Sequence, residues 1–130
     1  MASNCFGRSA AGAAVTERRA RLPRGRVSEA IAAGVLLTKG YRIVGRRVKT
    51  PAGEIDIIAV RAKRLAFVEV KRRRTRQDAE AAITKKQATR IRRAANLWLA
   101  RNPRFHEHEF GFDVVFLVPR HWPRHIANGL

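Results

Sequence analysis

The stretch GEIDIIAVRAKRLAFVEVKRR, residues 53–73, sets the fold of this chain. Apolar and polar residues alternate in EIDIIAV and again in LAFVEVK, with the period of two that is expected of β-strands. Between them, the polar run RAKR is typical of a turn. The stretch therefore predicts two adjacent antiparallel strands joined by a short connection.

The sequence on either side of this hairpin predicts two helices and two further strands. Before it, a helix follows Ser28 and ends at Gly40, and YRIVGRRV predicts a strand that makes three consecutive antiparallel strands with the hairpin. After it, Ala-rich residues 78–101 predict a long helix, and the apolar run FGFDVVFLVP, residues 110–119, predicts a buried strand. The predicted fold is α/β, with the core order αβββαβ.

The charge of the chain points to a polyanionic partner. The 130 residues include 28 Lys and Arg against 10 Asp and Glu, a net charge of +18. A surplus of this size opposes folding by self-repulsion unless a polyanion such as nucleic acid neutralises it. The length allows one domain, which we place at residues 27–119, after a basic N-terminal arm (1–26) and before a C-terminal tail (120–130).

Cysteine content and hydropathy indicate a cytoplasmic protein without a membrane anchor. Cys5 is the single cysteine, which excludes an internal disulfide and a Cys-rich zinc site. The longest apolar run, AIAAGVLL, is far shorter than the roughly 20 residues that cross a bilayer. No basic leader precedes an apolar block at the N-terminus, so no secretory signal is predicted.

Acidic side chains are expected to gather on one face of the hairpin. Strand alternation places Glu54 and Asp56 on one face of the first strand, opposite Ile55, Ile57 and Ala59. Glu69 and Lys71 share a face of the second strand. If both faces point to the same side, the acids meet in one patch. Two like charges about 4 Å apart repel by roughly 4 kcal/mol at an effective dielectric near 20, so a cation is expected between them.

A hard divalent cation, Mg²⁺ or Mn²⁺, fits such a patch because these ions take carboxylate ligands and leave positions open for a substrate phosphate. The expected ligands are Asp56, Glu69 and Glu54, with Lys71 beside the attacking water. The alternative is structural: Glu54 and Asp56 are solvated residues of an edge strand, and Glu69 pairs with Lys71 or a nearby Arg. An acid on one strand followed by Glu-x-Lys on the next, in an apolar context, favours the functional interpretation.

These residues carry a family resemblance. GEIDIIA, LAFVEVKRR, AITKKQATRIRRAANLWL and FDVVFLVP resemble uncharacterised protein family 0102, the YraN-like proteins, over roughly residues 26–119. That family resembles the PD-(D/E)XK nucleases, which include restriction enzymes and Holliday junction resolvases. The resemblance implies a restriction endonuclease-like mixed sheet flanked by helices, and a nuclease motif at Asp56, Glu69 and Lys71. The proline of the motif's name is absent, because Ile55 precedes Asp56. Resolvase-like enzymes pair two sites, which implies a homodimer.

Two further residues are candidates for the active site. Glu29 lies in the first helix, where resolvase-like nucleases place an additional acid; its alternative role is to stabilise the helix dipole in the first turn. Gln87 lies on the core-facing stripe of the second helix, where similar nucleases carry a polar residue. Its alternative role is in a capping box with Thr84.

Basic residues flank the acidic patch in sequence and are expected to bind phosphates. The candidate nucleic-acid-binding residues are Arg46, Arg47, Lys49, Arg72, Arg73, Arg74, Lys85 and Lys86. The function that these features predict is a Mg²⁺- or Mn²⁺-dependent endonuclease acting on DNA, and branched DNA is one candidate substrate. The alternative is a nucleic-acid-binding protein that keeps the fold and does not cut.

The remaining polar and aromatic candidates are predicted to be structural. Asp113 interrupts an apolar strand and is expected to form a salt bridge with an Arg. The stretch His106-Glu107-His108-Glu109 is typical of a polar turn. Trp98 is expected in the core, and Trp122 is expected to pack the C-terminal tail.

Overall fold

The computed structural model describes residues 26–75, 77 and 84–130. The predicted N-terminal arm, apart from residue 26, and most of residues 76–83 lie outside this description. A helix over residues 26–38 is followed by the strands β1 (Arg42–Thr50), β2 (Gly53–Arg61) and β3 (Arg64–Arg72), the helix α3 (Lys85–Ala100), the 3-10 turn η1 (Pro103–Phe105), and the strands β4 (Glu109–Leu117) and β5 (Arg124–Ile126).

The five strands form one mixed sheet in the order β1-β2-β3-β4-β5. The first three strands are consecutive antiparallel neighbours, as predicted. β4 runs parallel to β3, because the chain returns through α3 before it re-enters the sheet. β5 pairs antiparallel with β4. The predicted α/β fold is confirmed, and it is compatible with the restriction endonuclease-like fold.

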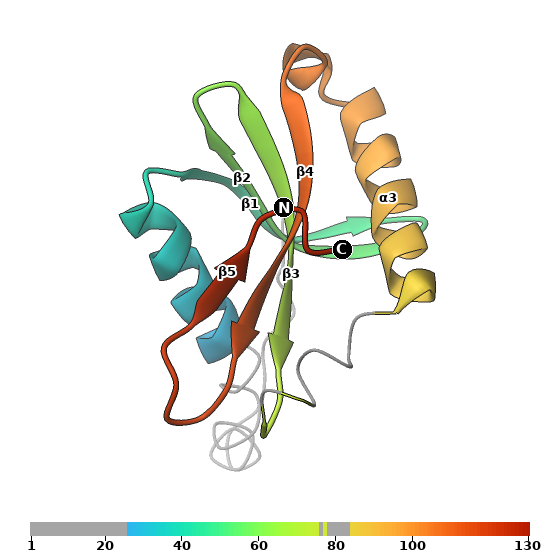
Figure 1. Ribbon diagram of the computed structural model, residues 1–130. Helices are drawn as coiled ribbons and strands as arrows, with labels where there is room; N and C mark the ends of the chain where they lie inside the picture. Colours follow the sequence, from blue (N-terminus) through green and yellow to red (C-terminus); the bar gives the residue numbers. More distant parts are fainter. Residues whose placement is uncertain (1–25, 76, 78–83) are drawn as a thin grey trace, which may run out of the picture.

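A helix covers each face of the sheet (Figure 1). On one face, Ala32, Ala33 and Leu36 of the 26–38 helix pack against β2, β3 and β4. On the other, buried residues of α3 pack against β2 and β3 around Phe67. The apolar residue Ile31 is not part of the first core, because its side chain is 43% exposed. Both cores thus enclose the middle strands.

The ends of the helices follow the residues that predicted them. Gly40 has a φ of 90°, a left-handed conformation that glycine adopts without strain, and its N–H donates to the Leu37 carbonyl. At the start of α3, the Thr84 hydroxyl accepts a hydrogen bond from the Gln87 N–H at 3.2 Å. The predicted helix end at Gly40 and the predicted cap at Thr84 are therefore confirmed. Residues 78–83 of the predicted second helix lie outside the described part of the chain.

The strict alternation predicted for β2 is wrong at Asp56. Ile55 packs in the core beneath α3, whereas Ile57 and Ala59 pack in the core beneath the 26–38 helix. Arg47 lies opposite Asp56 in β1 and has a φ of 52°, which interrupts the regular pleat. On the other side, the pairing of β2 with β3 covers Ile57 to Arg61, so it starts one residue after Asp56 and does not include it. Asp56 therefore stands where β2 changes faces.

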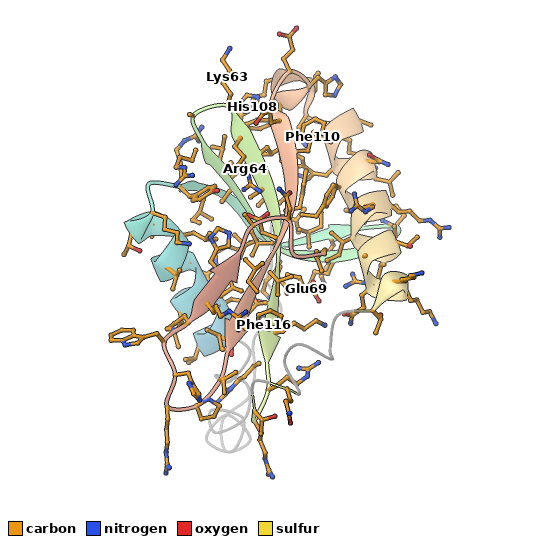
Figure 2. All side chains as sticks on the ribbon, viewed as in Figure 1. Lys63, Arg64, Glu69, His108, Phe110 and Phe116 are labelled. Carbon is orange, nitrogen blue, oxygen red and sulfur yellow. The ribbon has the colours of Figure 1, made fainter. Side chains whose placement is uncertain are left out.

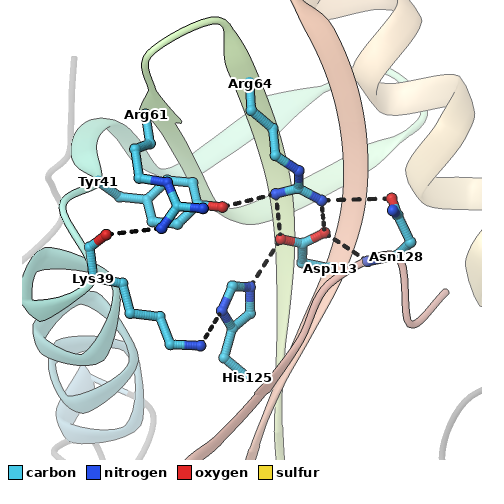
Figure 3. A network of polar contacts seen from close by, with 7 residues as sticks. All are labelled: Lys39, Tyr41, Arg61, Arg64, Asp113, His125 and Asn128. Atoms are coloured by element: carbon cyan, nitrogen blue, oxygen red, sulfur yellow. Dashed lines mark hydrogen bonds and ion pairs between the residues drawn. The ribbon is translucent and has the colours of Figure 1, made fainter.

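A polar network fixes β5, which the sequence did not predict, to the sheet (Figure 3). Asp113 of β4 accepts two hydrogen bonds of 2.8 Å from Arg64 and lies 2.8 Å from His125 Nε2 in β5. The N–H of Asn128 donates to the same carboxylate at 2.9 Å. The predicted salt bridge of Asp113 is confirmed. The network joins β3, β4 and the residues around β5.

Trp122 lies in the connection between β4 and β5, and the prediction that it packs the C-terminal tail is wrong. Its side chain is 92% exposed. The other tryptophan, Trp98, behaves as predicted: it is half-buried and packs edge-to-face against Phe67 and stacked against Phe105. The sequence could not separate the two, because a single tryptophan in a short polar segment has no periodicity that reveals its burial.

Candidate functional site

Acidic residues from three elements meet near the C-terminal ends of the parallel strands β3 and β4. The Asp56 carboxylate accepts a hydrogen bond of 2.8 Å from the backbone N–H of Val70 in β3. The backbone pairing of β2 with β3 stops at Ile57 and Val68, so at Val70 the Asp56 side chain accepts the hydrogen bond in place of the β2 backbone. Glu69 comes from β3 and Glu29 from the 26–38 helix, and the charges of both act on the Asp56 carboxyl. The structure thus brings these three predicted site residues together.

The environment of Asp56 disfavours its charged form. Burial raises the pKa of the Asp56 carboxyl to about 7, and the neighbouring charge of Glu69 adds to the increase, against the Val70 hydrogen bond. Burial also raises the pKa of Glu29, although Arg47 and Arg46 oppose this effect. A carboxyl whose pKa is near neutrality accepts either a proton or a cation readily.

Glu69 is paired with two cations in the described structure. Its Oε2 lies 3.1 Å from Lys71 Nζ and 3.6 Å from Arg90 NH2 of α3. Only 7% of the Glu69 and Lys71 side chains is exposed. The pairing that the structural alternative expected is therefore present. It uses only Oε2, because Glu69 Oε1 is buried and has no hydrogen-bond partner among the described residues.

Glu29 repeats this arrangement on the other side of Asp56. Its Oε2 lies 3.5 Å from Arg47 Nε, while its Oε1 is buried and finds no hydrogen-bond partner in the described part of the chain. An unsatisfied buried acceptor costs about 1–3 kcal/mol, and more when the group is charged. Two such oxygens beside a carboxyl of raised pKa make the acidic cluster, which we define as Glu29, Asp56 and Glu69, a place where a cation would be stabilised.

Two carboxylates of the acidic cluster, Asp56 and Glu69, are of the type that Mg²⁺ binds. Within the described residues, no three His, Cys, Asp or Glu side chains gather into a set that would hold a metal ion. Glu54 thus does not complete such a set, although its charge raises the pKa of Asp56. Mg²⁺ commonly uses one or two carboxylates together with waters and phosphate oxygens. Asp56 and Glu69 offer two carboxylates of this kind, and their role as metal ligands remains a prediction.

A pocket opens over Asp56 and is bordered by arginines. Its lining residues are Ser28, Glu29, Asp56, Val70, Arg72, Arg73, Arg74 and Pro119. The N–H of Arg73 donates to the Leu117 carbonyl at 3.1 Å, which holds the arginine run beside the end of β4. The predicted phosphate-binding residues of this run therefore lie at the acidic cluster. The pocket therefore combines two acids of the cluster, Glu29 and Asp56, with three arginines, whereas Glu69 and Lys71 are not among its lining residues.

The other predicted basic residues are distributed around the cluster. Arg46 and Arg47 lie close enough to Glu29 for their charges to lower its pKa. Lys49, Lys85 and Lys86 are exposed side chains of β1 and α3, and none of them lines the pocket over Asp56. Their predicted role in binding nucleic acid remains a prediction.

Two residues at the site were not predicted as members of it. Arg90 stands in a basic run of the second helix, yet it pairs with Glu69 and donates to the Glu54 carbonyl at 3.1 Å. Ser28 was expected only to precede a helix, yet it is buried in the pocket wall. The sequence held one signal for Arg90: it follows Gln87 by three residues and so lies on the same face of the helix, the face that was predicted to point toward the core.

Gln87 takes part in the N-terminal cap of α3 through its backbone, while its side-chain amide oxygen is buried. Its backbone N–H is bound by Thr84. Its side-chain Oε1 is buried and has no hydrogen-bond partner within the described ranges. Half of the predicted capping box is therefore present, and a role of the Gln87 amide in the active site remains a prediction.

The histidine-containing turn lies away from the acidic cluster. Figure 2 shows Lys63 and His108 at one end of the sheet, with Glu69 well below them. The turn is held there by the Glu109 N–H, which donates to the Lys63 carbonyl at 2.7 Å, and by His106 Nε2, which lies 2.6 Å from the Leu99 carbonyl. The prediction of a polar turn is confirmed for residues 106–108, whereas Glu109 is the first residue of β4.

Comparison with known proteins gives one consistent family. The model of the uncharacterised protein family UPF0102 matches residues 28–117, which include the whole acidic cluster. A UPF0102 protein from Nitrobacter winogradskyi is 50% identical over 111 residues, covering 85% of this chain and 94% of that protein. UPF0102 proteins from Rhodopseudomonas palustris strain BisB18 (88% of this chain, 84% of that protein) and Parvibaculum lavamentivorans (78% and 76%) are each 48% identical.

None of the helices in the described part of the chain combines the length and the apolar character that a membrane crossing requires.

Proposed function

The chain belongs to the uncharacterised protein family UPF0102, and we propose that it is a metal-dependent endonuclease that hydrolyses phosphodiester bonds in DNA, acting in the cytoplasm. One observation carries this proposal: buried oxygens of Glu29 and Glu69 that have no hydrogen-bond partner among the described residues lie near Asp56, and three consecutive arginines line the pocket that contains Asp56. Carboxylates can bind a divalent cation, and the arginines can bind a polyanion. Phosphodiester hydrolysis needs both at one place.

Asp56 and Glu69 are the residues that would hold Mg²⁺ or Mn²⁺. When bound, the cation supplies charge neutralisation at the phosphate and lowers the pKa of a water molecule. Lys71, 3.1 Å from Glu69, provides an ammonium that can donate to the attacking water or to the developing negative charge. Glu29 lines the Asp56 pocket from the 26–38 helix, and its Oε1, which has no hydrogen-bond partner among the described residues, can accept a hydrogen bond from a water.

Arg72, Arg73 and Arg74 would hold the phosphate backbone across the pocket. They are exposed and adjacent in sequence, and all three line the pocket that contains Asp56. Arginine binds phosphate oxygens through two parallel N–H groups, which fixes orientation as well as charge. In this proposal, the scissile phosphate lies between the arginines and the carboxylates of Asp56 and Glu29.

The test is cleavage of supercoiled plasmid and of branched DNA by the full chain, with Mn²⁺, with Mg²⁺ and with EDTA. We expect cleavage that requires the cation and that is lost in Asp56→Asn and Glu69→Gln. Glu107→Gln is the matched control, because Glu107 is an exposed acid in the histidine-containing turn. Cleavage that persists in both site variants would refute the assignment.

The second candidate is a nucleic-acid-binding protein without catalysis. The pairing of Glu69 with both Lys71 and Arg90 favours it, because this pairing gives the acid a structural role that requires no metal. Under this alternative, the wild-type protein binds DNA or RNA and cuts neither with any divalent cation. In addition, Glu69→Gln lowers stability without altering binding.

A further inference from the structure

Trp122 presents the largest exposed apolar side chain among the described residues. It is 92% exposed, whereas the next in that group, Leu37, is 56% exposed. An indole left in water forgoes the burial that would stabilise the fold. Aromatic residues held in this way on a surface are the usual platforms on which nucleobases stack.

The connection that carries Trp122 is an ordered turn rather than a long loop. The His121 N–H donates to the Val118 carbonyl at 3.1 Å, which closes a turn over Pro119 and Arg120. Arg120 has a φ of 67°, a conformation that favours glycine and costs about 1 kcal/mol or more for other residues. After Trp122, β5 pairs with β4, and His125 is bound to Asp113. The indole is thus carried by a segment that is fixed at both ends.

This turn borders the pocket over Asp56. Pro119 lines that pocket, and Trp122 follows it by three residues. Consecutive Cα atoms are about 3.8 Å apart, so the Cα of Trp122 lies within about 11 Å of the Cα of Pro119. That span is roughly three times the rise of about 3.4 Å per nucleotide along one strand of B-form DNA. The Arg73 N–H is bound to the Leu117 carbonyl, two residues before Pro119, so a phosphate at the arginine run and a base at Trp122 are within reach of one strand.

The sequence around Trp122 favours nucleic acid over an apolar partner. Basic residues, Arg120 and Arg124, stand two positions on either side of it, and the chain carries a net charge of +18. A single indole between arginines is too small an apolar patch for a protein interface, which buries about 800 Å² per partner. Stacking with nearby positive charge is the arrangement by which proteins bind single strands without reading their sequence.

We propose that Trp122 stacks against an unpaired base of DNA whose backbone crosses the arginine rim of the pocket. This inference deepens the proposed nuclease function and rests on it. It assigns the substrate class: DNA in which single-stranded nucleotides adjoin a duplex, as at a fork or a flap. Fully paired DNA keeps its bases stacked on one another and offers none to Trp122.

The experiment compares binding of three DNA molecules of equal nucleotide count, in EDTA so that no cleavage occurs: a blunt duplex, a single strand and a splayed-arm fork. Fluorescence anisotropy titrations use the wild-type chain, Trp122→Ala, Trp122→Phe and the control Leu97→Ala, whose residue is an exposed apolar side chain of α3. We expect Trp122→Ala to weaken binding to the fork and the single strand about tenfold, and to the duplex less than twofold. Trp122→Phe should retain most of the affinity.

The salt dependence separates stacking from charge. Trp122→Ala removes no charge, so the slope of log affinity against log salt should be unchanged. Equal loss on all three DNA molecules, or no loss on any of them, would overturn the inference. Because binding is measured without metal, a protein that fails to cut and still shows the fork-specific loss refutes the nuclease proposal alone. A protein that cuts and shows no such loss refutes the role of Trp122 alone.

Discussion

Lys71 Nζ and Glu69 Oε2 lie 3.1 Å apart, both nearly buried and both on the face of β3 that α3 covers. Removing one partner of a buried ion pair costs up to about 3–5 kcal/mol, while removing both costs much less. Among the described residues, Glu69 without Lys71 keeps only the more distant Arg90, at 3.6 Å, as a cationic partner. We therefore expect Lys71→Met to lower stability more than the double variant Lys71→Met, Glu69→Gln. Urea unfolding of the two single variants and the double variant measures the coupling. Additive effects would show that the two charges act independently.

Asp56 makes the stability of the metal-free protein depend on pH. Its pKa is raised from 3.8 to about 7, so the folded state favours the protonated carboxyl. The stabilisation is complete below about pH 4 and is lost as the pH rises through 7. Asp56→Asn, which carries no charge, should exceed wild type in melting temperature by at least about 4 °C at pH 8 in EDTA, with a smaller difference at pH 5. Equal differences at both pH values would contradict this.

A divalent cation should replace the proton at Asp56. Because the ligand must be deprotonated, binding is stronger above pH 7 than below it. Millimolar Mn²⁺ should raise the melting temperature of the wild-type protein more at pH 8 than at pH 6 and should leave that of Asp56→Asn unchanged. Scanning fluorimetry measures this, and Ca²⁺ at the same ionic strength tests for cation selectivity. A shift of equal size in Asp56→Asn would place the cation elsewhere.

Neutralising the arginine run should weaken DNA binding regardless of sequence. Replacing Arg72, Arg73 and Arg74 with alanine should reduce the slope of log affinity against log salt by up to about three units, one for each phosphate that the protein no longer neutralises. A variant with three alanines at Lys63, Arg101 and Arg104, basic residues outside the pocket lining, is the control of equal charge. If the control lowers the slope as much as the site variant does, the run has no special part in binding.

Asp113 should stabilise the protein above acidic pH. Burial alone would raise its pKa, but hydrogen bonds from Arg64, His125 and the Asn128 N–H outweigh this and hold the pKa well below the usual range. Its stabilisation is therefore present above about pH 4 and is lost as the pH falls further. Asp113→Asn should unfold at a lower urea concentration than wild type at pH 7, and the difference should narrow towards pH 3. A difference that does not change with pH would mean that the charge is unimportant.

Local patterns predicted the fold because each element carries its own signal. The alternation in the two hairpin strands, the helix end at Gly40 and the helix cap at Thr84 each depend only on residues a few positions away in the sequence. The short strand β5 carried no such signal, because its position depends on a hydrogen bond between His125 and Asp113, twelve residues earlier. A three-residue strand is too short for alternation to be recognised.

The candidate site was only partly predictable for the same reason. Asp56, Glu69 and Lys71 stood out because charges are rare inside apolar strands. The role of Arg90 depends on how α3 lies across β3, which no local pattern contains. The change of faces at Asp56 depends on a left-handed Arg47 in the neighbouring strand, and a positive φ is uncommon for any residue but glycine.

The change of faces in β2 gives the acidic cluster two mechanical supports. Ile55 on one side of Asp56 is embedded beneath α3, and Ile57 on the other side is embedded beneath the 26–38 helix. The position of the Asp56 carboxylate is therefore set by two apolar cores at once, because each neighbouring isoleucine is fixed in a different core. We therefore expect loss of a methyl group from either core to shift the same carboxylate, so that volume changes far from the pocket alter the geometry of the site.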